Sequence, residues 1–300
     1  MTEHRAHFDA TAHFTNGGDL TANGFRLDLP SEHADEAEVA KLFVQHLGLA
    51  LVERVDISNL AIVEEQHRGS RNIEIPAHNA GELVDLSHTI SEGLITYPGL
   101  PAPTFQPFLT REDSIAKYAP GTQFAMDSIT MIGNTGTYLD SPFHRFEGGT
   151  DLAGLELATL VDQPAEVFHL QDSLSRGIPA SVFFDRDVRG KAVLLHTGWD
   201  RHFAQPEYLR DAPYLTEEGT RYLIEQGVTI VGIDSLNIDN TEADAAGARP
   251  AHTLLLDAGV HVVEHLTNLG ALPSSGSRFT AVPPKVAGFG TFPVRAFARL

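Results

Sequence analysis

Short apolar runs, each interrupted by glycine or proline, occupy most of the sequence between residues 83 and 300. Runs of this length are typical of strands, and no window approaches the roughly 20 apolar residues needed to cross a bilayer. The clearest runs are Leu83–Leu86, Ala125–Ile132, Ala192–Leu195, Val228–Ile233 and Val260–Leu266. This pattern predicts a mixed α/β (α+β) domain with many strands and few helices, and no membrane partner.

One helix is well marked within this region. Thr216 is expected to cap it, Glu217 and Glu218 favour its N-terminus, and Gly227 is expected to end it before the apolar run that starts at Val228.

The first 64 residues predict a separate small module. Small and aromatic residues alternate with polar ones from Phe8 to Phe14, which is the pattern of a half-buried strand, and Asn16–Gly18 supplies a turn before a return strand at Gly24–Leu29. A helix is expected at Glu36–Leu47.

Ser31 or Asp35 is positioned to cap this helix, and the alternating pattern of Leu51–Val63 predicts a further strand. We therefore expect a β-β-α-β module at residues 1–64, a polar linker at residues 65–82 and the main domain at residues 83–300.

Composition excludes several classes of function. The formal net charge is −19 and the pI is about 5.1, which argues against binding to the phosphate backbone of a nucleic acid. The sequence has no cysteine, so a metal must be held by His, Asp or Glu. The N-terminal segment lacks the basic and apolar stretches of a signal peptide, which favours a cytoplasmic location.

Polar side chains recur at even-numbered positions in the most informative stretch: Asn134, Tyr138, Asp140 and His144. On an extended backbone they share one face; Gly136 leaves room between them, and Pro142 is expected to prevent a helix before His144. A carboxylate and an imidazole four residues apart are suited to a metal ligand and a general base. Asp-Ser-Pro is also a common sequence in turns, so a functional site and an ordinary turn both remain possible on the residues alone.

A second stretch places Glu264 in line with three apolar residues of the run Val260–Leu266, where a carboxylate is costly unless it is paired or bound to a metal. A position at the strand end, or a salt bridge to an arginine, is the alternative. The neighbouring His261 and His265 are expected on the other face, at the surface. His252 follows Pro250, where a helix could start, and a histidine in that position alone is more often a capping or packing residue than a ligand.

Other candidates carry weaker signals. Asp234 and Asp239 follow an apolar strand, at a place where sites often lie but also where strands simply meet solvent. Trp199, Phe143 and the turn Tyr97–Gly99 are candidates for the wall of an aromatic pocket.

An ordered set of segments carries a resemblance to a known family. These segments are Asp85-Leu86-Ser87-His88, Tyr97-Pro98-Gly99, the stretch 134–144, Thr197-Gly198-Trp199, Gly232-Ile233-Asp234, His252 with Glu264 twelve residues on, and Pro293-Val294-Arg295. Residues 83–300 resemble the cyclase-like metal-dependent hydrolases, which include bacterial kynurenine formamidase and isatin hydrolase. The resemblance implies a swivelling β/β/α-type domain, a small-molecule substrate and a homodimer or higher homo-oligomer.

The family motif is His-x-Gly-Thr-His-x-Asp-x-Pro-x-His. Carried over to this chain, it makes Asp140 a metal ligand together with His252 and Glu264, and His144 the acid/base. The two leading histidines are replaced here, by Asn134 and Tyr138. An amide oxygen is a weak zinc ligand and a phenol coordinates only once deprotonated, so the resemblance implies one divalent ion, zinc or manganese, rather than two.

Three hypotheses follow. The first is a hydrolase of an amide, lactam, lactone or N-formyl bond, in which the metal activates water, His144 is the acid/base, and Tyr138 and Asn134 donate hydrogen bonds to the oxyanion. The second is metal-free catalysis by His144 as base and Tyr138 as acid. The third is a non-catalytic binding or regulatory protein on an inactivated hydrolase fold, with residues 1–64 as its interaction surface.

Overall fold

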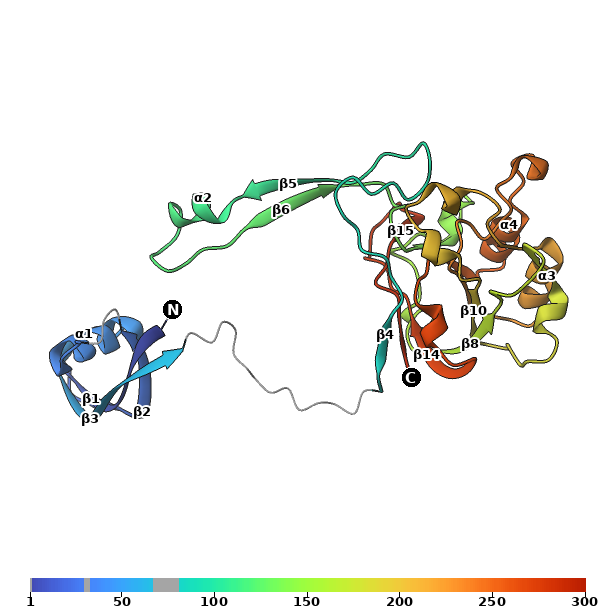
Figure 1. Ribbon diagram of the computed structural model, residues 1–300. Helices are drawn as coiled ribbons and strands as arrows, with labels where there is room; N and C mark the ends of the chain where they lie inside the picture. The colour runs from blue at the N-terminus through green and yellow to red at the C-terminus, as the bar shows by residue number, and fades with distance from the viewer. Residues whose placement is uncertain (1, 30–32, 67–80) are drawn as a thin grey trace. The chain divides into compact units, whose positions relative to one another are not determined.

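The computed structural model describes residues 2–29, 33–66 and 81–300 (Figure 1). The chain divides into two compact units, residues 1–78 and residues 79–300. Most of the expected linker lies outside the described residues, and its first two residues, Glu65 and Gln66, belong to a strand.

The first unit is a three-stranded antiparallel sheet, in the order β2-β1-β3, covered by one helix within its described residues. Its elements are β1 Thr2–Phe14, β2 Asp19–Leu29, α1 Glu36–His46 and β3 Val52–Gln66. The expected β-β-α-β module is therefore confirmed. Of the two expected caps, Asp35 accepts a hydrogen bond from the backbone N–H of Glu38 at 2.9 Å, and Ser31 lies outside the described residues.

The core of the first unit follows from the alternating pattern of β1. Phe8, Ala10 and Ala12 are buried beneath Val39 and Phe43 of α1. The rings of Phe8 and Phe43 pack edge to face, with centroids 5.7 Å apart.

The second unit contains, within residues 81–300, a nine-stranded mixed sheet in the order β15-β7-β13-β12-β10-β8-β14-β16-β4. Its strands are β4 Leu83–Asp85, β7 Tyr138–Asp140, β8 Gln163–His169, β10 Ala192–His196, β12 Ile230–Ile233, β13 His261–Glu264, β14 Ser275–Thr280, β15 Thr291–Pro293 and β16 Phe297–Arg299. The mixed α/β fold expected from the sequence is confirmed.

Two smaller strand pairs complete the unit: β9 Gly177–Ile178 with β11 Tyr214–Leu215, and β5 Thr104–Leu109 with β6 Met126–Thr130. The second pair forms a long ribbon (Figure 1).

The helices are α2 Arg111–Ile115, α3 Glu217–Glu225 and α4 Pro250–Asp257. The 3-10 helices are η1 Pro142–His144, η2 Leu157–Thr159, η3 Ala180–Phe183, η4 Trp199–His202, η5 Pro206–Leu209, η6 Ala243–Ala245 and η7 Leu269–Ala271. Among the described residues, no helix is long and apolar enough to span a bilayer.

The helix expected after Thr216 is α3. The Thr216 hydroxyl accepts a hydrogen bond from the backbone N–H of Gly219 at 3.1 Å, and Gly227 follows the helix with a φ of +70°, which glycine adopts at little cost. The next strand begins at Ile230, two residues later than the apolar run suggests.

Strands β8, β10, β12 and β13 run parallel, and apolar clusters cover both faces of this part of the sheet. For this reason the expectation that His261 and His265 lie at the surface is wrong: both are buried, because the sheet has no solvent-facing side here. His265 also has a φ of +54°, so the alternation of the strand ends at Glu264.

Candidate active site

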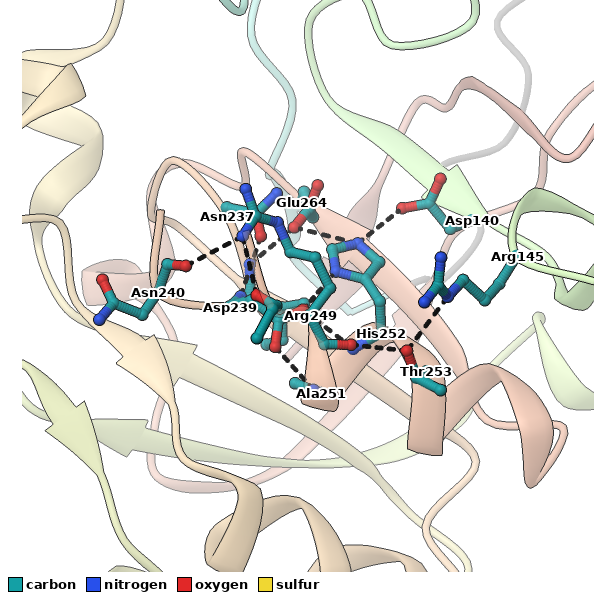
Figure 2. A network of polar contacts seen from close by, with 12 residues as sticks. Asp140, Arg145, Asn237, Asp239, Asn240, Arg249, Ala251, His252, Thr253 and Glu264 are labelled. Atoms are coloured by element: carbon teal, nitrogen blue, oxygen red, sulfur yellow. Dashed lines mark hydrogen bonds and ion pairs between the residues drawn. The ribbon is translucent and has the colours of Figure 1, made fainter. Parts of the chain in front are cut away.

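A cavity of about 380 Å³ in the second unit brings together five of the six predicted site residues. Asn134, Tyr138, His144, His252 and Glu264 line it. The sixth, Asp140, is fully buried within reach of His252 (Figure 2).

Strand register explains why residues far apart in the sequence meet here. β7 lies between β13 and β15, so Tyr138 is paired with Glu264, and Asp140 is paired with Thr291. Directly paired residues on neighbouring strands place their side chains side by side on one face of the sheet.

The stretch 134–144 is only partly extended. Residues 134–137 form a bend, Tyr138–Asp140 is strand, and Pro142–His144 is a turn of 3-10 helix. The expectation that Pro142 prevents a helix is therefore wrong. Proline is tolerated at the first position of a helix, because the N–H of that position has no partner within the helix.

His252 is fixed by the start of α4. Asp239, in the loop after β12, accepts hydrogen bonds from the backbone N–H groups of Ala251 and His252 at 2.6 and 3.1 Å. The same carboxylate accepts from the Nδ1–H of His252 at 2.7 Å. A histidine held by a carboxylate through one nitrogen presents the other as a free lone pair, which is the usual arrangement of a metal-binding histidine.

The free Nε2 of His252 faces two carboxylates. It lies 3.6 Å from Oδ2 of Asp140 and 3.5 Å from Oε1 of Glu264 (Figure 2). These separations are longer than a hydrogen bond. They are close to the distance of about 3.4 Å between two ligand atoms that each lie about 2.1 Å from one tetrahedral ion.

Asp140 provides a second sign of a metal position. Its Oδ1 accepts a hydrogen bond from the hydroxyl of Thr291, but its buried Oδ2 has no hydrogen-bond partner. A buried carboxylate oxygen is costly when unsatisfied, and a divalent cation would satisfy it. The arrangement of Asp140 and His252 therefore fits a divalent ion, for which Glu264 is the third candidate ligand.

Among the described residues, ligand-capable atoms of Asp140, His144 and His252 lie within 4.8 Å of one another. This set contains His144, but Nδ1 of His144 is already 2.7 Å from the Thr291 hydroxyl. Glu264 is buried and lies nearer to His252, so we regard it as the better third ligand.

The pKa shifts of the buried groups agree with a site that binds a positive charge. Burial opposes charging of His252, yet Glu264 and Asp140, with Asp239, raise its pKa to about 10. Burial raises the pKa of Glu264 to about 7, although His252 opposes this shift. Burial would also raise the pKa of Asp140, but His252 and His144 outweigh it, so this carboxyl group ionises more readily than usual.

Tyr138 is hydrogen-bonded to a candidate metal ligand. Its hydroxyl donates to Oε2 of Glu264 at 2.7 Å, and Oε1 of that carboxylate accepts from the backbone N–H of Ile238 at 2.6 Å. Burial, reinforced by the Glu264 charge, raises the pKa of Tyr138 well above its usual range. Tyr138 is therefore a neutral donor that fixes Glu264, not an anionic ligand.

A hydrogen-bonded chain continues behind Tyr138. Nε2 of His265 lies 3.3 Å from the Tyr138 hydroxyl, and Nδ1 of His265 lies 2.8 Å from the hydroxyl of Tyr208. Burial lowers the pKa of His265 to about 3, so the ring stays neutral. A neutral ring donates to Tyr138 through Nε2–H and accepts from Tyr208 at Nδ1.

His144 lies at the edge of the cavity, with its side chain about one third exposed. Because the Thr291 hydroxyl donates to Asp140, it accepts from the Nδ1–H of His144, which leaves Nε2 as the basic nitrogen. Gly290 permits this contact: a Cβ at that residue would lie 2.3 Å from the backbone nitrogen of His144.

Several sequence candidates lie elsewhere. Trp199 lines a separate cavity of about 130 Å³, and neither it nor Phe143 lines the larger cavity; of the expected aromatic wall only Tyr97 does. Asp234 is buried and accepts hydrogen bonds from the backbone and hydroxyl of Thr197, which indicates a structural role.

Sequence reasoning assigned no role to Asp239, Thr291, Arg145 or Arg249. Asp239 carried a signal as an acid after an apolar strand. Arg145 directly follows His144 and Arg249 directly precedes Pro250, whereas nothing in the sequence marks Thr291.

Comparison with known proteins places this chain in a family. Residues 84–240 match the model of the Cyclase family, described as "Putative cyclase". The kynurenine formamidase of Geobacillus thermodenitrificans (strain NG80-2) is 29% identical over 218 residues, which are 72% of this chain and 96% of that protein.

Two solved structures resemble the chain. A "potential metal-dependent hydrolase with cyclase activity" superposes with a TM-score of 0.59 at 26% identity, covering 73% of this chain and 98% of that one. Isatin hydrolase A from Labrenzia aggregata superposes with a TM-score of 0.62 at 23% identity, covering 74% and 94%. The family resemblance expected from the sequence is confirmed.

Proposed function

The chain belongs to the Cyclase family, and from that premise we propose that its second unit is a metal-dependent hydrolase of a C–N bond in a small aromatic amide, formamide or lactam. The observation that carries the proposal is the group of Asp140, His252 and Glu264 beside a cavity, with a buried carboxylate oxygen that lacks a partner. The formamidase name of a relative and the metal-dependent hydrolase with a similar structure support it.

Asp140, His252 and Glu264 would hold one divalent ion, zinc or manganese, and the oxygen-rich ligand set suits either. When bound, such an ion polarises the substrate carbonyl and lowers the pKa of water. Asp239 keeps the His252 ring in the tautomer whose Nε2 accepts, and Tyr138 keeps Glu264 in place.

His144 is the proposed general acid/base. Its Nε2 takes a proton from the attacking water as the water oxygen bonds to the carbonyl carbon. It returns that proton to the nitrogen as the C–N bond breaks, so a formamide and water give an amine and formic acid, which releases its proton to give formate. Thr291 holds the ring through Nδ1 and so fixes which nitrogen carries the lone pair.

Asn134 and Tyr138 remain the proposed hydrogen-bond donors near the developing oxyanion. Asn134 is half-buried, hydrogen-bonds Tyr138 and lines the cavity. Because the hydroxyl proton of Tyr138 is directed at Glu264, the Asn134 amide is the better placed of the two to donate to substrate.

The proposal is tested by metal content and turnover measured on the same protein. Protein purified without chelator is analysed for zinc and manganese and assayed on formanilide by release of aniline. We expect one ion per chain, loss of activity on chelation, and a loss of about 10²–10⁴-fold in kcat for His144→Gln. His202→Gln is the matched control, since His202 lies on η4 beside Trp199 and does not line the cavity.

Turnover without metal that still needs His144 would replace this proposal with metal-free catalysis. Binding of amides without turnover, in protein that contains metal, would replace it with a binding protein.

We also propose that the enzyme is a homodimer or higher homo-oligomer. The ribbon of β5 and β6, with α2, carries large apolar side chains that are exposed within the described residues: Phe105, Phe108, Ile115, Phe124, Met126 and Ile129. An exposed apolar surface of this kind favours contact with another protein surface. Sedimentation of the full chain tests it, and a monomer at micromolar concentration would contradict it.

A further inference from the structure

Two arginines line the cavity of the candidate site. Arg145 follows His144 directly, and Arg249 precedes Pro250 at the start of α4 (Figure 2). The chain has 40 acidic and 21 basic residues, yet the cavity lining contains two guanidinium groups and one carboxylate, that of Glu264. The lining of this cavity thus has more guanidinium groups than carboxylates, the reverse of the balance in the whole chain.

Arg249 is held in place by neutral acceptors. Its Nη1 donates to the backbone carbonyls of Ala248 and Asn240 at 2.8 and 3.1 Å, and its guanidinium also hydrogen-bonds the hydroxyl of Tyr97. A guanidinium has five N–H donors, so this arrangement fixes the group and still leaves donors for a ligand.

Arg145 is held by one contact to the same helix. Its Nε donates to the hydroxyl of Thr253 at 3.1 Å, which leaves both terminal nitrogens of its guanidinium for other partners (Figure 2). Because Thr253 lies in the first turn of α4 and Arg249 is the N-cap of that helix, both arginines lie at the same helix end.

Neither Arg145 nor Arg249 has a carboxylate partner among the residues that the structure describes. Many other arginines do: Arg186 with Glu166, Arg189 with Asp187, Arg221 with Glu217, Arg278 and Arg299 with Asp162, and Arg295 with Asp85. Arg210 also lacks one, but it is exposed and does not line the cavity.

We infer that Arg145 and Arg249 bind a carboxylate of the substrate, so that the substrate is an anionic aromatic amide or formamide. A guanidinium matches the planar, two-oxygen geometry of a carboxylate, and a charge-assisted hydrogen bond in a partly buried cavity is strong. A cavity of about 380 Å³ accommodates one aromatic ring with its substituents. This inference rests on the proposed function and names the substrate class of the same site.

The kinetic test uses the holoenzyme with 2-, 3- and 4-formamidobenzoate, each beside the matching formamidobenzamide, which has the same shape and no charge. We expect at least one carboxylate to exceed its amide in kcat/KM by about 10- to 100-fold. Arg249→Met and Arg145→Met each lower this preference by about tenfold, mainly through KM, and Arg249→Lys retains part of it because the charge remains. Arg210→Met, the matched control, leaves the preference unchanged.

A binding test separates the inference from the proposed function. Calorimetry compares benzoate with benzamide on the wild type and on each variant, and it needs no turnover. If no formamide is cleaved, the proposed function fails, and tighter benzoate binding that weakens in both arginine variants still supports the arginine site. Equal binding of benzoate and benzamide, or benzoate binding that the arginine substitutions leave unchanged, overturns the inference. A wild-type enzyme that cleaves charged and neutral formamides equally well overturns it as well.

Discussion

Each unit of the molecule places a histidine among carboxylates, and the two groups differ in what they leave unsatisfied. In the first unit, His13 lies 2.6 Å from Oδ1 of Asp19 through Nδ1 and 2.9 Å from Oδ2 of Asp56 through Nε2. Both ring nitrogens therefore have direct partners. Both carboxylates are more than half exposed, so water solvates whatever charge remains.

In the second unit, His252 uses only Nδ1 in a direct hydrogen bond, to Asp239. Its Nε2 lies 3.5 to 3.6 Å from two carboxylates, and all of these groups are buried. The contrast shows that residue types do not make a metal site by themselves. A gap of the right size between buried ligand atoms, one of which has no hydrogen-bond partner, distinguishes the candidate site from a surface ion pair.

The most direct test of this difference between the His252 and His13 groups is to remove one carboxylate from each. Glu264→Gln keeps the shape of the side chain but removes a proposed ligand and its charge. We expect metal affinity to fall at least about 100-fold and hydrolysis to fall with it. The measurement is metal content by mass spectrometry after dialysis, with Asp19→Asn as the counterpart from the His13 group. A Glu264→Gln protein that retains its metal would remove Glu264 from the ligand set.

A smaller effect on metal affinity is expected from Asp239, the carboxylate that holds the His252 ring. Asp239→Asn retains a hydrogen-bonding group beside Nδ1 of His252 but loses the charge that orients the ring. Such changes typically lower metal affinity by about 10- to 100-fold. Competition with a chromophoric chelator gives the affinity, and Asp56→Asn is the control. Equal affinities in the two proteins would mean that Asp239 acts only on the start of α4.

The sequence predicted the parts of this site that have local signals. Proline before His252 marks the start of α4, and the even-numbered spacing of Tyr138 and Asp140 places both on one face of β7. These features depend on a few neighbouring residues, so they can be inferred from periodicity and capping rules. The position of Glu264 beside Tyr138 depends on pairing between β13 and β7, which no local pattern encodes.

The failures have the same origin. His265 was expected at the surface, but a strand covered on both faces has no exposed side, and a left-handed residue ends its alternation. Thr291 has no local signal, since it meets Asp140 only through pairing of β15 with β7. Long-range pairing therefore decides which of many polar residues reach the site.

Thr291→Val tests this long-range contact, with an effect smaller than the loss of a ligand. Valine keeps the shape but removes the hydroxyl that accepts from Nδ1 of His144 and donates to Oδ1 of Asp140, so the ring loses its fixed tautomer. We expect kcat to fall about 10- to 30-fold with little change in KM, as for the loss of two hydrogen bonds. Thr159→Val is the control, since the Thr159 hydroxyl contacts His261 at 3.1 Å outside the cavity. Equal losses in the two variants would show a general effect on stability instead.

The smallest expected effect lies in the His13 group. Hydrogen bonds that the His13 ring donates to Asp56 and Asp19 raise the pKa of His13 above its usual value of about 6.5. A raised pKa in the folded state stabilises the unit at pH values below the pKa of the unfolded chain. That contribution disappears as the pH rises through the pKa of the folded state.

The measurement is hydrogen exchange of the backbone amides of β1 in the full chain. These amides should exchange more slowly at pH 5.5 than at pH 8, after correction for intrinsic rates. His13→Gln should remove most of this difference. Metal content should not change, because no proposed ligand is altered. If His13→Gln lowered metal content instead, the His13 and His252 groups would be coupled. The distinction between an exposed histidine whose two ring nitrogens both have partners and a buried one that binds metal would then be wrong.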